Sequence, residues 1–140
     1  MYKRKSWQEK FEVKRDPEIV ISERDFADVP AGASMLIATP GIVANYIKHI
    51  PKGKTGSLQQ MRKDLAAEYH ADYMCPITAG IFLRIVAEAA YEEYEKGKAL
   101  KNITPFWRMI DERSPTLKKL SFGKEFVLDM RQKEKLVEVT

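Results

Sequence analysis

Apolar residues recur every three or four positions over residues 42–50, a spacing that predicts a helix. Thr39 followed by Pro40 is typical of a helix start, because threonine caps the first turn and proline lacks only an N–H that has no partner there. Pro51 ends the element, since proline cannot continue the hydrogen bonding of a helix. The first regular helix is therefore expected between Thr39 and Pro51.

Two further helices are predicted in the middle of the chain. Ser57 and Gln60 form a capping-box signature for a helix that carries leucines and a methionine inward. Residues 70–75 form a connector, and Pro76 opens the longest helix, which frays near Gly97. A broad apolar stripe runs along this helix and consists of Ile77, Ile81, Phe82, Ile85, Val86, Ala89 and Ala90.

The part of the chain after Gly97 is more irregular. Because Pro105 disfavours a helical conformation at the preceding residue, residues 103–110 are expected to be extended. A last helix begins at about Ser121 and places its apolar residues on one side. Residues 136–139 are expected to close the chain as a strand.

The order of these elements predicts an α/β fold that is mainly α. Residues 1–36 show little periodicity and form an N-terminal arm with one or two short strands, of which residues 19–21 are the clearest. Over residues 37–140, a helix, a basic turn, a capped helix, a connector, a long helix and extended segments follow one another. This succession is typical of a winged helix-turn-helix domain.

Composition limits the class of protein. At 140 residues the chain is about one domain, and its 44% hydrophobic and 31% charged residues are ordinary for a globular protein. No apolar run approaches the length of a membrane span, and the basic N-terminus lacks the apolar segment of a signal peptide. The single cysteine, Cys75, excludes an internal disulfide and suits a reducing compartment. A cytoplasmic protein with no membrane partner is expected.

Charge is unevenly distributed along the chain. The formal net charge is +4, and residues 48–63 carry five basic residues and no acidic one. Residues 1–15 carry six basic residues against two acidic ones, whereas residues 88–95 are acidic. A basic face of this kind suits a partner that carries phosphates, although solvated surface charge explains the same pattern.

Four segments of the chain resemble one known family in the same order. IPKGKTGSLQQMRKDLA (residues 50–66) resembles the I-P-x-G-K-x-x-x-x-x-Q stretch of the alkylguanine DNA-alkyltransferases, the methylated-DNA–protein-cysteine methyltransferases. CPITAGIFLRIVAEAA (residues 75–90) falls on the family's recognition helix, and TPFWRMI (residues 104–110) on its P-C-H-R-V-[IV] motif. KEFVLDM (residues 124–130) is similar to its terminal helix. The resemblance covers about residues 40–132.

This resemblance implies a fold and a chemistry. The family has a winged helix-turn-helix domain that places its recognition helix in the minor groove of DNA. An arginine pushes the damaged base outward, and the cysteine of P-C-H-R takes the alkyl group. A histidine, a water molecule and a glutamate activate that cysteine, because the thiolate is the nucleophile.

The chain departs from the family at each reactive position. Phe106 stands at the cysteine position, Trp107 at the histidine position, and the alignment places Arg131 at the glutamate. Leu58 replaces a tyrosine of the second helix, and Ile77 lies nearest to the intercalating arginine. Alkyl transfer is therefore not expected.

The substitutions are similar to those of alkyltransferase-like proteins, which bind alkylated DNA and recruit repair without reacting. The sequence accordingly predicts a non-catalytic protein that binds double-stranded DNA, linked to DNA damage recognition and to a repair-protein partner. Two alternatives stay open. One is a protein-interaction module on the same fold that has lost DNA binding, and the other is a divergent thiol transferase that uses Cys75.

The candidate site residues fall into two groups. Pro105, Phe106, Trp107 and Arg108 are the base-pocket candidates, in which the two aromatic rings either form a wall for an extruded base or fill the core. The DNA-binding candidates are Lys52, Lys54, Arg62, Ile77, Thr78, Gly80 and Arg84, with the alternative that these are ordinary surface residues.

Other chemistry is not expected. Cys75 lies at the start of the long helix, where a thiolate is favoured, but no histidine is adjacent. His49 and His70 have no neighbouring ligands at the spacing of a zinc site. Lys52 and Lys54 flank Gly53 without the spacing of a phosphate-binding loop. The sequence therefore predicts no metal, no cofactor and no catalytic residue.

Overall fold

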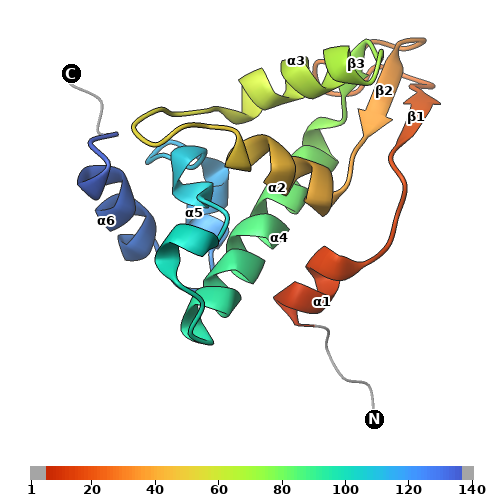
Figure 1. Cartoon of the computed structure of the whole chain (residues 1–140). Coiled ribbons are helices and arrows are strands. Elements are labelled where there is room, and N and C mark those ends of the chain that lie inside the picture. The colour runs from red at the N-terminus through yellow and green to blue at the C-terminus, as the bar shows by residue number, and fades with distance from the viewer. Residues whose placement is uncertain (1–5, 137–140) are drawn as a thin grey trace.

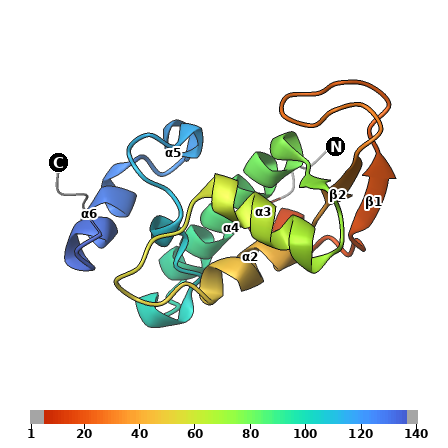
Figure 2. The same ribbon diagram turned by 90° about the horizontal axis from the view of Figure 1, so that it is seen from above.

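The computed structural model describes residues 6–136 as a mixed α/β fold with a small sheet and six helices. The sheet lies at one end of the molecule and α6 lies at the other, in both views (Figures 1 and 2). The elements are α1 (Trp7–Glu12), β1 (Glu18–Ile21), β2 (Ser34–Ile37), α2 (Pro40–Lys48), α3 (Leu58–Glu68), β3 (Tyr73–Met74), α4 (Pro76–Glu95), α5 (Pro115–Lys119) and α6 (Glu125–Lys133), with two 3₁₀ turns, η1 (Leu100–Asn102) and η2 (Phe106–Arg108).

The long helix α4 is the centre of the core. It packs against α1, α2, α3, α5 and η2, and so joins elements that come before and after it in the chain. Phe82, Val86, Ala89 and Ala90 are buried in this packing, as the apolar stripe predicts, and Leu83 and Ala87, which were not assigned to the stripe, are buried as well. Ile77 and Ile81, which were assigned to the same stripe, are corrected here, since they are 56% and 50% exposed.

The sheet joins the N-terminal segment to the rest of the chain. Its order is β1-β2-β3, with β1 antiparallel to β2 and β2 parallel to β3. The N–H of Cys75 donates to the carbonyl oxygen of Leu36 at 2.8 Å and continues this parallel pairing into the start of α4. The expected boundary between residues 36 and 37 falls inside β2, a strand that pairs on both sides.

The helix starts follow their local signals. The side chain of Thr39 accepts a hydrogen bond from the N–H of Ile42, with Pro40 in the first turn of α2. The side chain of Ser57 likewise accepts from the N–H of Gln60 at the start of α3. Both predicted caps are therefore present.

Several expected features of the chain ends differ from the structure. Residues 7–12, for which no element was predicted, form α1 behind a Ser6–Glu9 capping box. Residues 106–108 form a 3₁₀ turn in place of an extended segment. Part of the predicted strand at residues 136–139 lies outside the described residues. The three strands described all precede α4, so the strands of a wing after that helix are not among them.

No helix in the described range 6–136 combines the length and the apolar character needed to cross a lipid bilayer.

Candidate functional site

The 3₁₀ turn η2 separates the side chain of Phe106 from those of Trp107 and Arg108. This turn has about three residues per turn, so neighbouring side chains lie about a third of a revolution apart. The N–H of Phe106 donates to the carbonyl oxygen of Thr104 at 2.8 Å, which sets the turn directly after Pro105. Phe106 consequently points into the core, while Trp107 and Arg108 reach toward the end of α6.

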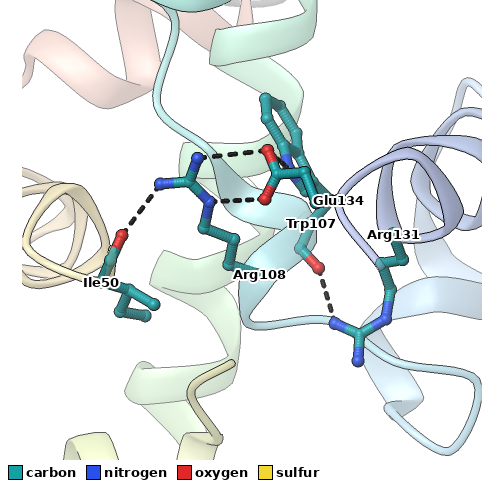
Figure 3. A network of polar contacts seen from close by, with 5 residues as sticks. All are labelled: Ile50, Trp107, Arg108, Arg131 and Glu134. Carbon is teal, nitrogen blue, oxygen red and sulfur yellow. Dashed lines mark hydrogen bonds and ion pairs between the residues drawn. The ribbon is translucent and has the colours of Figure 1, made fainter. Parts of the chain in front are cut away.

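Glu134, the C-cap residue of α6, holds both of these side chains (Figure 3). Its carboxylate accepts from Trp107 Nε1 at 2.9 Å, and from Arg108 Nε and Nη2 at 2.8 and 3.1 Å. Arg108 Nη1 also donates to the carbonyl oxygen of Ile50 at 2.8 Å, next to the turn after α2. The network thus fastens η2 to the ends of two helices that are far apart in the sequence.

Arg131 lies on the same side of α6, but it does not replace this carboxylate. Its side chain is buried and donates from Nη1 to the carbonyl oxygen of Trp107 at 2.7 Å. The group at the indole of Trp107 is therefore Glu134, three residues beyond the position where the alignment placed Arg131.

The carboxylate of Glu134 stays charged at neutral pH. Its side chain is only 6% exposed, and this burial alone would raise its pKa. The hydrogen bonds from Arg108 and Trp107, with the positive charges of Arg108 and Lys52, outweigh burial and leave the pKa below its ordinary value. Glu134 is therefore an ion-pair partner and not a proton donor.

A hollow of about 710 Å³ opens beside this network. Exposed lysines at positions 48, 52 and 101 stand around it, and no ion pair joins any of them to an acid within the described residues. The hollow is lined by Lys48, Lys52, Leu100, Lys101, Asn102, Ile103, Pro105, Trp107, Arg108, Met130 and Glu134. The acidic residue that lines the hollow, Glu134, is already paired with Arg108. The three lysines therefore give the hollow a positively charged rim. We call it the basic hollow.

Of the base-pocket candidates, Pro105, Trp107 and Arg108 line the basic hollow, whereas Phe106 does not. Phe106 has no exposed surface, and its ring packs against Trp107, Phe122 and Phe126 at centroid distances of 5.4, 5.8 and 5.8 Å. Phe106 is thus a core residue and not a wall of an open pocket. Trp107 is 3% exposed, so little more than an edge of its ring reaches the hollow.

The DNA-binding candidates separate in space. Lys52 and Lys54 are exposed in the turn between α2 and α3. Arg62 is committed elsewhere, because it donates to both oxygens of Asp28 at 2.9 and 2.8 Å and from Nη2 to the carbonyl oxygen of Met74 at 2.7 Å. Its hydrogen bond lowers the pKa of Asp28 against the opposing effect of burial. A phosphate would have to displace Asp28 to reach Arg62.

The candidates on α4 form a mostly apolar surface. Ile77 is exposed, Gly80 has open space around it, and Thr78 is half-buried. Arg84 packs over the Trp7 ring at 5.0 Å and lies 3.5 Å from the buried carboxylate of Glu88. None of these four residues lines the basic hollow, so the structure does not bring this surface to it.

The thiol and the histidines lack partners for chemistry. Cys75 is 6% exposed. Nδ1 of His49 lies 2.7 Å from the carbonyl oxygen of Asn45, and His70 is exposed in a turn. No group of three or more histidine, cysteine, aspartate or glutamate side chains in residues 6–136 is arranged to hold a metal ion.

Sequence reasoning missed several residues that line the hollow, among them the charged residues Lys48, Lys101 and Glu134. Both lysines belong to charged stretches without a motif, and their shared position depends on how α2 and η1 pack. The family resemblance placed Arg131 where the family has a glutamate on the last helix, so it gave no signal for Glu134.

Comparisons of this chain with protein-family models, with curated proteins and with solved structures find no match.

Proposed function

We propose that this protein is a non-catalytic DNA-binding protein of the alkyltransferase-like type. The observation that carries the proposal is the basic hollow, in which three lysines without ion pairs in the described range surround a carboxylate already neutralised by Arg108. Such a surface attracts the phosphates of a nucleic-acid strand. The succession α3, connector, α4 agrees with the proposed helix-turn-helix, and the winged form of that fold is part of the proposal.

The Trp107–Glu134 pair supports the link to the alkyltransferases. In that family a histidine and a glutamate act together on the reactive cysteine. Here Trp107 stands at the histidine position and donates its indole N–H to a glutamate on the last helix, so a hydrogen-bonded pair is kept in the same relation. A buried phenylalanine at the cysteine position leaves no nucleophile there.

A non-catalytic role makes a direct prediction. Duplex DNA that contains an O6-alkylguanine is expected to bind the protein and to leave its mass unchanged, as mass spectrometry after incubation would measure. The buried state of Cys75 supports this expectation, because a shielded thiol cannot reach a base. A mass gain on Cys75 would replace the proposal with the thiol transferase.

Lysines of the basic hollow are expected to control DNA affinity. A variant with Lys48, Lys52 and Lys101 replaced by glutamine should bind duplex DNA more weakly, and the slope of log K against log salt should decrease by about 3, one for each lost phosphate contact. Fluorescence titration over a range of salt concentrations measures both quantities.

A matched control removes the same charge elsewhere. Lys118, Lys119 and Lys124 are exposed and do not line the hollow. Their replacement by glutamine should change the slope by much less. Equal losses in the two triple variants would mean that net charge, and not the hollow, drives binding.

The second candidate function is a protein-interaction module, favoured by one observation. Ile77 and Ile81 lie one turn apart on α4 and are about half exposed, which suits an apolar contact with another protein better than contact with phosphates. Chemical-shift mapping with duplex DNA separates the two functions. Shifts around residues 48–54 and 101–108 support DNA binding at the hollow, whereas no shifts anywhere at low salt favour the interaction module.

A further inference from the structure

The strand β1 forms an open edge of the sheet. It pairs only with β2 among the described strands, and it lies at the outer margin of the molecule in both views (Figures 1 and 2). Its central residues, Ile19, Val20 and Ile21, carry no charge. Proteins usually protect such an edge with a lysine, a proline or a bulge in the strand, because its free N–H and C=O groups can pair with another strand.

The hydrogen bonds of Ser22 show which backbone groups are free. Its N–H donates to the carbonyl oxygen of Ala33 at 2.9 Å, and its carbonyl oxygen accepts from the N–H of Gly32 at 2.7 Å. Both groups of Ser22 therefore point toward β2. Since this direction alternates along a strand, Val20 also points toward β2, and the backbone groups of Ile19 and Ile21 point away from the sheet.

The side chains of Ile19 and Ile21 lie on the face of the sheet that packs on the core, but both are exposed. Ile19 is paired with Leu36, which is paired in turn with Met74, and paired residues share one face. Leu36 and Met74 are 0% and 1% exposed, whereas Ile19 and Ile21 are 47% and 62% exposed. The apolar face of the sheet thus continues from β3 and β2, where it is buried, to β1, where it is exposed.

We infer that β1 is a dimerisation strand, which pairs with β1 of a second copy of this chain in antiparallel orientation. Ile19 lies opposite Ile21 of the second copy, and Val20 lies opposite its own counterpart on the two-fold axis. In this register Ile19 and Ile21, whose backbone groups point away from their own sheet, pair across the interface. Each Ile19–Ile21 pair forms two backbone hydrogen bonds, so the interface contains four. It also brings the four exposed isoleucines together on one face.

The flanking residues favour a second copy as the occupant. Asp16 precedes β1 and Arg24 follows it, so an antiparallel pairing about a two-fold axis brings the Asp16 end of each strand to the Arg24 end of the other. Shifting the register by two residues toward the N-terminus places Pro17 opposite Ile21, where the proline has no N–H to donate. A shift in the other direction places Ile19 opposite Glu23 and loses the contact between its side chain and an isoleucine.

Cysteine substitution tests the register directly. Val20 faces its counterpart at a non-hydrogen-bonded position, where Cα atoms are about 4.5 Å apart, within the range of a disulfide. The two copies of Ile19 are about 9 Å apart, beyond that range. Because the only native thiol, Cys75, is buried, oxidation should convert V20C to a covalent dimer and leave I19C largely uncrosslinked. Equal crosslinking of both variants, or of neither, would overturn the register.

Sedimentation equilibrium of the full chain tests the dimer itself. The molar mass should rise with concentration from 16.1 kDa toward twice that value. Ile21→Lys should keep the protein monomeric, and Ile77→Lys, at an equally exposed isoleucine on α4, should leave dimerisation unchanged. A native chain that stays monomeric overturns the proposal, and so does a dimer that Ile77→Lys abolishes while Ile21→Lys does not.

Discussion

Replacement of Glu134 by alanine is expected to lower the free energy of unfolding by about 3 to 5 kcal/mol. The carboxylate is 6% exposed and Arg108 is 14% exposed, so the change leaves a largely buried guanidinium without its partner. It also leaves the indole N–H of Trp107 without its acceptor, because Glu134 is the group to which it donates. Urea denaturation monitored by circular dichroism measures the difference.

Two further variants separate the contributions within this network. Glu134→Gln keeps an oxygen for Trp107 but removes the charge opposite Arg108, so its cost should lie below that of alanine. Asp129→Ala removes an exposed acid from the same helix and should change the stability by about 0.5 kcal/mol or less. If Glu134→Ala cost no more than Asp129→Ala, the network would not fasten η2 to α6.

The stabilisation by Glu134 should depend on pH in one direction. Its pKa is lower in the folded chain than the ordinary value of 4.5, so folding favours the charged form. The contribution is fully present above pH 4.5 and is lost as the pH falls through the folded pKa. The difference in unfolding free energy between the native chain and Glu134→Gln should therefore shrink in acid. A constant difference from neutral pH to about pH 3 would contradict this assignment.

Local signals predicted the starts of the main helices, because each depends on a few neighbouring residues. Thr39 and Pro40 at α2, Ser57 at α3 and Pro76 at α4 all act within one turn of the chain. The α1 helix had such a signal too, in Ser6 and its capping glutamate. It was missed because the helix has only 6 residues, fewer than two turns, so no periodic apolar pattern can mark it.

Long-range pairing could not be predicted in the same way. The two residues of β3 form a strand because they lie beside β2, with Met74 opposite Leu36, far away in the sequence. The open edge of β1 follows from this order of strands. A sequence pattern indicates that a segment can form a strand, but it does not identify its neighbour.

Only part of the candidate site was predicted, because its hydrogen bonds also join residues that are far apart in the sequence. Trp107 and Arg108 were identified from a motif, yet their acceptor lies 27 and 26 residues further along. On α6 the residues three apart, Arg131 and Glu134, share one side of the helix, and both reach η2. The choice between them depends on the rotation of α6 against the core, which an alignment of short motifs does not determine.

Replacement of Phe106 by alanine is expected to cost about 3 to 5 kcal/mol of stability, as for other fully buried aromatic residues. The ring has no exposed surface and packs against Phe122 and Phe126, the first of which stacks in turn on Tyr91. Its removal leaves a cavity beside these rings. Thermal and urea denaturation measure the loss, and Phe106→Leu should recover part of it.

The same variants decide between the two interpretations of this position. For a core residue, Phe106→Leu should destabilise the protein and leave its affinity for duplex DNA within about twofold of the native value, a change of less than 0.5 kcal/mol. For a pocket wall, the affinity should fall while the stability changes little, because base–aromatic stacking contributes about 1 to 3 kcal/mol. Tyr94→Ala, at an aromatic residue that is 39% exposed, controls for the loss of a ring as such. Because the ring of Phe106 has no exposed surface and can stack only on its neighbours in the core, the first outcome is expected.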